Sequence, residues 1–247
     1  MSLREKWDAH ASEWIAWARA PGHDSYWRFH RDAFLALVSP PGALTVDVGC
    51  GEGRLTRDLR ARGHRTIGVE PSSAMLSAAR EADPGGDYRQ GAAEAIPLPD
   101  GEADLVVSFM VFQDVDDLEG AVKDCARILR PGGRLCAAIV HPINSSGLFE
   151  NEDVDSPFVM RDSYLGERDY EESLGRAGLT MTFHSRHRPL ESYARALEGA
   201  GFLIEKVREP PAIENREMSE RSKRWLRIPL FLHVLAVKEG HAPRFAR

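Results

Sequence analysis

The spacing of hydrophobic residues changes repeatedly along this chain. From about residue 43 onwards, short β-branched runs alternate with stretches in which apolar residues recur every three or four positions. This alternation predicts a parallel sheet wrapped by helices. The predicted strands are Leu44–Val48, Arg65–Glu70, Asp87–Gln90, Asp104–Phe109, Arg134–Val140, Phe202–Val207 and Leu230–Val237.

Helical spacing is clearest in the predicted helix Asp117–Leu129, where Leu118, Val122 and Cys125 share one face. Proline cannot continue a helix and glycine permits a turn, so this helix should end where Pro131 and two glycines follow. Further helices are predicted at Arg54–Arg62, at Ser72–Glu81 and from Pro189 to Gly201. The fold class predicted from these elements is α/β, with a doubly wound, mostly parallel sheet of seven strands.

Two segments fall outside the alternation. Residues 1–42 predict a helical cap of two helices, one with three tryptophans and the other spanning Ser25–Val38. Burial of Trp14 and Trp17 is expected to anchor this cap, in preference to stacking on a ligand. Residues 141–186 form an insert, and its part from His141 to Thr182 has nine acidic side chains against three arginines. Long insertions at this rim of an α/β sheet usually form lids or substrate walls.

We therefore expect a single domain, with the cap at 1–42, a ligand-binding half at 43–140, the insert at 141–186, and a C-terminal helix and strands at 187–247. The formal net charge of -6 and the pI of about 5.9 argue against nucleic acid or an anionic membrane as a partner, since both need a cationic face. A basic cluster at 221–227 is expected to be a solvated turn, with a phosphate-binding patch as the alternative.

The three cysteines show no metal-ligand spacing, and no stretch has signal-peptide or membrane-spanning character. Reduced thiols, no bound metal and a cytoplasmic location are the expectation.

The most informative motif is a glycine-rich turn directly after the first predicted strand. Gly49, Gly51 and Gly53 occupy alternate positions, and a helix is predicted to begin at Arg54. Glycines permit positive φ angles and let a ligand approach the backbone closely. The turn lies at the carboxyl end of a central strand, where open α/β sheets bind ligands. Asp47, just before it, can accept hydrogen bonds from the turn or from a ligand ammonium group.

The alternative interpretation of this turn is a dinucleotide site with the pattern G-x-G-x-x-G. Here the spacing is G-x-G-x-G, and Arg54 stands where the third glycine would allow close packing of helix and strand. An adenosine-containing ligand without phosphates suits the turn better.

A second motif places Glu70 at the tip of the second predicted strand. A carboxylate there can accept hydrogen bonds from both hydroxyls of a ribose. As an alternative, Glu70 can stabilise the N-terminus of the following helix. Together with the glycine turn, the ribose role is favoured. The polar loop after the third strand, Gly91–Asp100, is placed to border an adenine, or it is an ordinary surface turn.

Together these motifs resemble the class I S-adenosylmethionine-dependent methyltransferases, above all their small-molecule "type 11" group. The match covers residues 43–140 and extends less clearly over the C-terminal strands. The resemblance implies that Gly49, Gly51 and Gly53 border the methionine part of the cofactor and that Glu70 holds its ribose. It also implies an antiparallel seventh strand at one edge of the sheet, paired with Phe202–Val207.

The adenine-contacting aspartate of that family is replaced here by Ala92, so Ala93 and Glu94 become the candidates for this contact. The expected cofactor, S-adenosylmethionine, would also contact residues that flank the motifs. These are Asp47, Cys50, Pro71 and Phe109.

Methyl transfer depends mainly on alignment, and a general base is needed only when the acceptor arrives protonated. His141 is the first candidate base, with a structural role as the alternative. Gln113 and Asp114 follow the fourth strand and are candidates for acceptor contacts, and Asp114 is also a catalytic candidate, unless the acidic residues there cap the next helix. Other polar residues are expected to face the acceptor or close over the cofactor. These are His184, His187, Arg188 and Tyr26.

Motifs of base, glutamine and C5-cytosine methylation are absent from the sequence, so the expected acceptor is a neutral or cationic small molecule. Two other functions remain open. One is a protein that binds the cofactor without turnover, and the other is an NAD-dependent oxidoreductase, which Arg54 and the lack of a Tyr-x-x-x-Lys pair disfavour.

Overall fold

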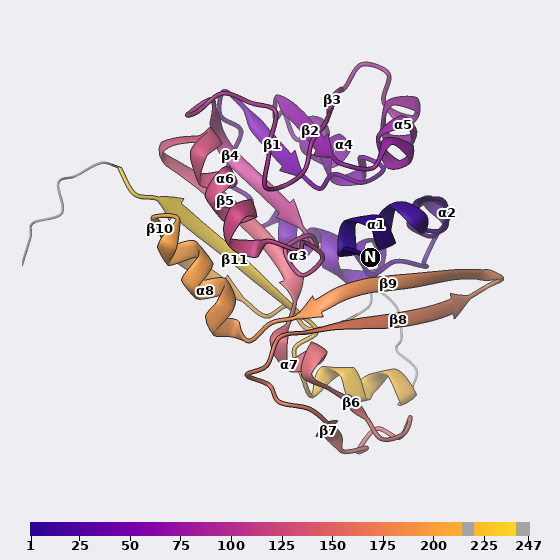
Figure 1. The fold of residues 1–247 in the computed structure, drawn as a ribbon. Helices are drawn as coiled ribbons and strands as arrows, with labels where there is room; N and C mark the ends of the chain where they lie inside the picture. The colour runs from indigo at the N-terminus through magenta and orange to yellow at the C-terminus, as the bar shows by residue number, and fades with distance from the viewer. Residues whose placement is uncertain (214–219, 241–247) are drawn as a thin grey trace, which may run out of the picture.

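A seven-stranded sheet forms the centre of the molecule. The computed structural model describes residues 1–213 and 220–240, and the sheet order is β10-β11-β5-β4-β1-β2-β3. The strands are β1 Thr45–Val48, β2 Thr66–Glu70, β3 Asp87–Gln90, β4 Ala103–Phe109, β5 Leu129–Val140, β10 Phe202–Arg208 and β11 Phe231–Lys238. β1 is parallel to β2 and β4, which confirms the predicted doubly wound α/β sheet (Figure 1).

The position of the last strand, β11, in the sheet order differs from the expected one. β11 is antiparallel and pairs with β10, as expected, but it lies between β5 and β10, so β10 forms the edge. The expected edge position of β11 is therefore wrong. Burial explains the order, because Leu232, Leu235 and Ala236 of β11 are buried, whereas most of β10 is exposed.

Helices cover both faces of the sheet. They are α4 Arg54–Ala61, α5 Ser73–Ala82, α6 Leu118–Ile128 and α8 Leu190–Gly199. Successive side chains of a strand point to opposite faces, and β4 shows the consequence. Val106 packs in the cluster that contains α6 and α8, while Leu105 and Val107 pack in the cluster that contains α4. The three cysteines are buried and unpaired.

The N-terminal cap has more elements than the two helices predicted. They are α1 Leu3–Ala9, α2 Ala11–Arg19, the π-helical turn η1 Tyr26–His30 and α3 Arg31–Leu35. The first predicted helix is interrupted at His10, and the second ends at Leu35 instead of Val38. No proline or glycine marks the break at His10, so the hydrophobic spacing alone did not reveal it.

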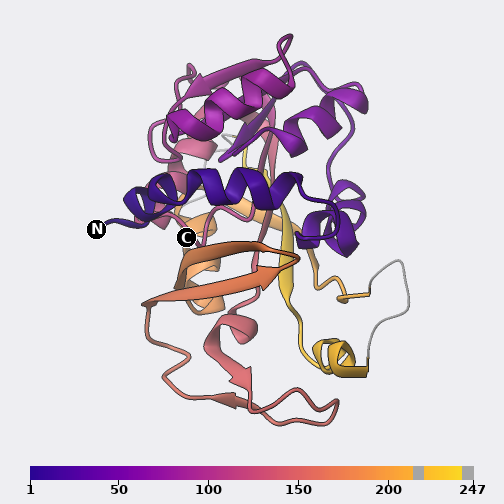
Figure 2. The same ribbon diagram turned by 90° about the vertical axis from the view of Figure 1, so that its right-hand side faces the viewer.

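The insert folds into a short helix and two hairpins. These are α7 Pro142–Ser146, the pair β6 Gly147–Phe149 and β7 Phe158–Met160, and the longer pair β8 Arg168–Arg176 and β9 Leu179–His187. Figure 2 shows α1 and α2 lying between the β8–β9 hairpin and the part of the sheet near α4 and α5. Two chain segments far apart in sequence therefore meet over the carboxyl ends of the parallel strands.

The basic cluster at 221–227 contacts the insert. Part of it lies on the 3₁₀ helix η2 Glu220–Leu226, where Arg221 pairs with Glu152 at 2.6 Å. Arg227 donates to the carbonyl of Ser156. The cluster thus ties η2 to the acidic loop of the insert, a role that neither sequence interpretation included.

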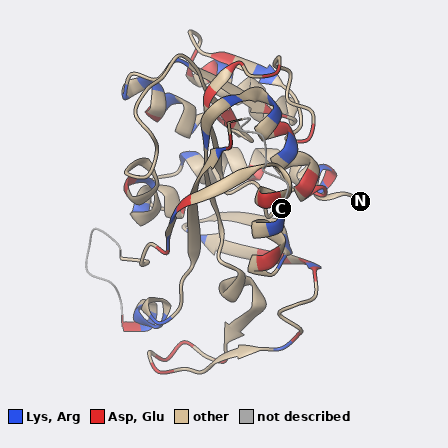
Figure 3. Ribbon diagram, turned by 90° about the vertical axis from the view of Figure 1, so that its left-hand side faces the viewer, with Lys and Arg blue, Asp and Glu red and all other residues tan. Residues whose placement is uncertain are grey.

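Along the ribbon in Figure 3, positions of Lys and Arg are interspersed with positions of Asp and Glu. Among the described residues, no helical segment combines the length and the hydrophobicity that a membrane span requires.

Candidate functional site

A cavity of about 1300 Å³ lies at the carboxyl ends of the parallel strands. Its walls come from the turns after β1, β2 and β4, from the cap, and from the β8–β9 hairpin. Binding cavities for one small ligand typically measure about 300–1,000 Å³, so this cavity has room for more than one molecule. Twelve carboxylates and six arginines line it, which favours cationic over anionic ligands.

The glycine turn forms one wall. Gly49 and Gly51 have φ angles of +71° and +56°, in the region that favours glycine. A Cβ on Gly49 would lie 2.4 Å from Cγ2 of Val111, and one on Gly51 would lie 3.2 Å from Nε1 of Trp14. The glycines therefore let the protein's own side chains close against the turn, in addition to leaving its backbone accessible to the cavity.

Gly53 lies in different surroundings from the other two glycines of the turn, Gly49 and Gly51. It is the N-cap of α4, with φ at +84°, and a Cβ there would lie 2.9 Å from the Tyr88 hydroxyl oxygen. The structure thus places Gly53 in the packing between α4 and β3, behind the turn residues that border the cavity.

Glu70 borders the cavity at the end of β2. One carboxylate oxygen accepts from the backbone N–H of Gly51 and the other from that of Ser72, each at 3.0 Å. Burial raises the pKa of Glu70 to about 7 although both hydrogen bonds oppose the shift. Glu70 therefore joins the glycine turn to the start of α5, and a ligand that donates to it or carries positive charge would favour its ionised form.

Asp47 is a second buried carboxyl of the same wall. It accepts a 2.6 Å hydrogen bond from the Thr56 hydroxyl, and desolvation by burial raises its pKa to about 7. Cys50, Pro71, Ala92, Ala93, Glu94 and Phe109 also line the cavity. At the rim, Glu94 lies 3.9 Å from Arg4 of the cap, where both side chains are exposed.

Arg54 is buried between the turn and the cap. Its guanidinium lies 2.8 Å from a carboxylate oxygen of Asp24, and the two side chains are only 8% and 9% exposed. The guanidinium carbon also lies 4.9 Å from the ring centre of Trp14 and 4.5 Å from that of Tyr26. Arg54 thus connects the start of α4 to α2 and to the start of η1 in the cap through charge and cation–π contacts.

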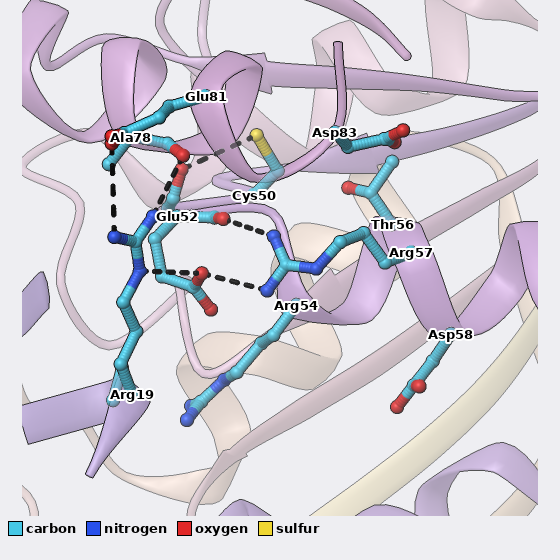
Figure 4. A network of polar contacts seen from close by, with 12 residues as sticks. Arg19, Cys50, Glu52, Arg54, Thr56, Arg57, Asp58, Ala78, Glu81 and Asp83 are labelled. Carbon is cyan, nitrogen blue, oxygen red and sulfur yellow. Dashed lines mark hydrogen bonds and ion pairs between the residues drawn. The ribbon is translucent and has the colours of Figure 1, made fainter. Parts of the chain in front are cut away.

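A second set of contacts clamps α2 onto the turn (Figure 4). Nε of Arg19 lies 3.6 Å from the buried carboxylate of Glu52, which also pairs with Arg57 at 2.8 Å. Arg19 donates as well to the carbonyl of Ala78 in α5. Because Glu52 stands inside the glycine turn, the cap is held on the same backbone that lines the cavity.

The segment after β4 lines the cavity next to that turn. Met110 has φ at +61°, an uncommon backbone conformation for a residue other than glycine and one that clusters at functional sites. Gln113 and Asp114 follow and line the cavity, and of the two Gln113 is buried while Asp114 is partly exposed. The cap of α6 is supplied by Asp117, whose carboxylate accepts from Gly120. Asp114 is therefore available for another role.

The histidines that the sequence singled out are held by other contacts. Nδ1 of His141 accepts from the backbone N–H of Ile143, and its Nε2 lies 2.9 Å from Glu209. His187 bonds to Ser145 and to the carbonyl of Tyr164, and His184 lies 3.1 Å from a ring nitrogen of His10. His141 is the N-cap of α7. This is a structural role of the kind that the sequence left open as the alternative to a base.

Arg188 and Tyr26 are also engaged in packing contacts. Arg188 donates to the carbonyls of Phe112 and Val115, so it braces the segment that carries Asp114. Tyr26 is fully buried, and its hydroxyl donates to Asp58 at 2.6 Å. Both side chains support the wall of the cavity from behind.

Sequence reasoning missed the residues that the β8–β9 hairpin contributes. Phe183 of β9 lies edge-on to Trp7, Trp14 and Trp17, with ring centres 6.2–6.3 Å apart. Tyr170 and Ser185 face each other across the hairpin and line the cavity. The only available signal was the alternation of polar and apolar residues between 179 and 187.

Comparison with known proteins gives a consistent picture. Residues 46–137 match a family model described as "Methyltransferase domain". The chain is 36% identical over 123 residues to the malonyl-[acyl-carrier protein] O-methyltransferase of Serratia marcescens, covering 48% of each chain. It is 29% identical over 161 residues to the ubiquinone biosynthesis O-methyltransferase of Marinobacter nauticus, covering 62% of this chain and 66% of that one.

Among solved structures, the chain resembles an S-adenosylmethionine-dependent methyltransferase from Mesorhizobium loti. The TM-score is 0.69 with 26% identity, over 87% of this chain and 98% of that one. The chain spans about half the length of the first curated relatives that it matches. The part of the chain that matches the family model, residues 46–137, carries the glycine turn.

Proposed function

The chain is a class I S-adenosylmethionine-dependent methyltransferase by its fold and by residues 46–137, and from this premise we propose that it methylates a small molecule inside the cavity described above. The observation that carries the proposal is the arrangement of Glu70 and the Gly49–Gly51 turn along one wall of a cavity with room for two ligands.

The residues present fit S-adenosylmethionine. Glu70 stands at the end of β2, where a ribose diol can donate to it, and the glycine turn offers accessible backbone to the amino acid part. Burial raises the pKa values of Asp47 and Glu70 more than their hydrogen bonds lower them, and a cationic ligand in the cavity would favour the ionised form of both carboxyls. Bound there, the sulfonium supplies an electrophilic methyl group.

The protein's own contribution is alignment and exclusion of water. The cap covers the turn through Arg19 and Arg54, and the ring cluster around Phe183 fixes the hairpin against the cap. Holding two reactants in this enclosure can contribute on the order of 7–11 kcal/mol through orientation. The buried place of Arg54 also argues against the dinucleotide alternative, because its side chain fills the space beside the turn.

The titration of the two carboxyls gives the first test. S-adenosylhomocysteine should bind about tenfold more weakly at pH 6 than at pH 8 for each carboxyl that the ligand keeps ionised, since protonation near pH 7 removes the acceptor. Calorimetry in buffers of different ionisation enthalpy should show protons released on binding at pH 6. Absence of binding at pH 8 would refute the proposed function.

Replacing Glu70 separates its role from that of Asp47. The Glu70→Gln variant should bind S-adenosylhomocysteine about 10- to 100-fold more weakly, because charge-assisted hydrogen bonds contribute about 1.5–3 kcal/mol. Part of the pH dependence should disappear with it. The exposed Glu119→Gln variant is the control, and equal affinities of the two variants would contradict the ribose role.

The names of several relatives indicate an oxygen acceptor. The two curated relatives described above are both named O-methyltransferases, one acting on a malonyl group held by acyl-carrier protein. We extend this to the present chain as part of the proposal, because its cavity has space beside the cofactor wall for an acceptor. A cofactor-binding protein without turnover is the alternative, and any transfer to an acceptor would exclude it.

A further inference from the structure

Asp114 is the carboxyl of the cavity that best meets the needs of a general base. It lies five residues after β4, and one carboxylate oxygen accepts a 2.6 Å hydrogen bond from the Ser185 hydroxyl of β9. The other accepts a 3.1 Å hydrogen bond from the Gln113 amide. These contacts hold the carboxyl in place from β9 and from its own loop, and neither contact neutralises it.

Gln113 provides an unfilled acceptor beside this carboxyl. The side chain is 3% exposed and lines the cavity, while its amide oxygen is buried without a hydrogen-bond partner in the described part of the chain. A buried acceptor of this kind costs about 1–3 kcal/mol unless a ligand donates to it. The group that occupies this place should therefore carry a hydrogen-bond donor.

The sheet order places an apolar section of the cavity next to these residues. Glu70 is the last residue of β2, and Asp114 follows β4, which lies two strands away in the sheet. On the opposite side of β4 lie the end of β5 and the start of β11, where Val140 pairs with Phe231. These ends, with the cap, η2 and β6, contribute apolar lining residues. They are Phe29, Val140, Leu148, Trp225, Leu230 and Phe231.

We infer that the acceptor is a neutral molecule with a flat apolar body and an acidic hydroxyl, a phenol or an enol, which Asp114 deprotonates during transfer. The inference rests on the proposed function and names its substrate class. A carboxylate acceptor fits poorly beside Asp114, since it would bring a second negative charge into a buried site. An aliphatic alcohol is too weak an acid to match the carboxyl.

The transfer balances without a further reactant. The hydroxyl oxygen forms a bond to the methyl carbon while the sulfur–carbon bond breaks and its electron pair remains on sulfur. The hydroxyl proton passes to Asp114, and solvent later receives it. Ser185 and Gln113 keep the accepting oxygens oriented, and the Gln113 amide oxygen is free to receive a donor of the acceptor molecule.

The pH dependence follows from the surroundings of Asp114. Desolvation by burial raises its pKa to about 8, against the hydrogen bonds from Ser185 and Gln113 and the charge of Arg188. The other titratable groups that it influences are Tyr170 of β8 and Tyr193 of α8, whose pKa values are raised. Only the ionised carboxyl accepts a proton, so the rate should rise with pH and level off at or below about pH 8, because a bound cation lowers this pKa.

The test uses three probes with one apolar body, which are naphthol, naphthylamine and naphthoic acid. The full chain with S-adenosylmethionine should methylate naphthol and neither of the others, as detected by mass spectrometry. Calorimetry with S-adenosylhomocysteine already bound should show naphthol binding without turnover. Preferred transfer to the amine or the carboxylate would overturn the substrate class.

Variants of two neighbouring aspartates test the base. Asp114→Asn should lower the rate of naphthol methylation about 10²- to 10⁴-fold and remove the rising limb of the pH profile, with little change in naphthol or S-adenosylhomocysteine affinity. Asp117→Asn is the control, because asparagine also caps a helix well.

The outcomes separate this inference from the proposed function. An Asp114→Asn variant as active as the unchanged chain would overturn the role of the base. If S-adenosylhomocysteine binds but naphthol neither binds nor reacts, the substrate class is wrong and the proposed function stands. If S-adenosylhomocysteine itself does not bind, the proposed function fails first.

Discussion

Replacing Asp24 by alanine should lower the free energy of unfolding by about 3–5 kcal/mol, because it leaves the charge of Arg54 buried without its carboxylate. The effect should exceed that of a surface pair because both side chains are less than a tenth exposed. The substitution also removes the carboxylate that accepts a hydrogen bond from the Tyr26 backbone N–H. Urea denaturation followed by tryptophan fluorescence measures the change.

A double-mutant cycle distinguishes loss of the pair from general damage to the cap. Arg54→Met with Asp24→Ala should be more stable than Asp24→Ala alone, since the second change removes the unpaired charge. Asp32→Ala serves as the control, because Asp32 is 75% exposed in its pair with Arg31 and should change stability by no more than about 1 kcal/mol. Additive effects of the two changes would show that the pair is not coupled.

Gly49→Ala should destabilise the protein by about 2–5 kcal/mol. About 1–2 kcal/mol comes from the left-handed backbone, where φ is +71°. Overpacking typically adds about 1–3 kcal/mol, and here the new Cβ would lie 2.4 Å from Cγ2 of Val111. Urea midpoints and S-adenosylhomocysteine affinity should both fall.

Gly201→Ala isolates the backbone contribution. Gly201 has φ at +78°, and no atom lies within 4 Å of its ideal Cβ position, so only the cost of the left-handed backbone remains. In the double variant Gly49→Ala with Val111→Ala, part of the lost stability should return because the contact is relieved. If Gly49→Ala and Gly201→Ala lower the free energy of unfolding equally, the close approach of Val111 does not contribute to the loss of stability.

The parts of the site that the sequence predicted are those encoded locally. The glycine turn, Asp47 and Glu70 lie within about 25 residues of each other, and strand periodicity fixes which sheet edge they reach. The structure brings these residues to one cavity wall, with Gly53 behind it. Their contact with a cofactor remains a prediction that the titrations above test.

Contacts between distant segments were beyond sequence reasoning. Asp114 and Ser185 are separated by 71 residues, and their contact depends on how the β8–β9 hairpin packs. The rim position of His141 suggested a base, but its two ring nitrogens bond to Ile143 and Glu209. Hydrophobic spacing determines which face of an element is buried, whereas the partner of a polar side chain depends on tertiary packing.

The walls of the cavity come from two sets of segments, and this division bears on which functions related proteins share. The family match spans residues 46–137, which supply the glycine turn, Glu70 and Asp114. The rings and apolar surfaces opposite them belong to the cap, the insert and the C-terminal strands. Relatives that are similar over residues 46–137 therefore share the wall for the methyl donor. Their acceptors can differ, because the opposite walls come from segments outside this range.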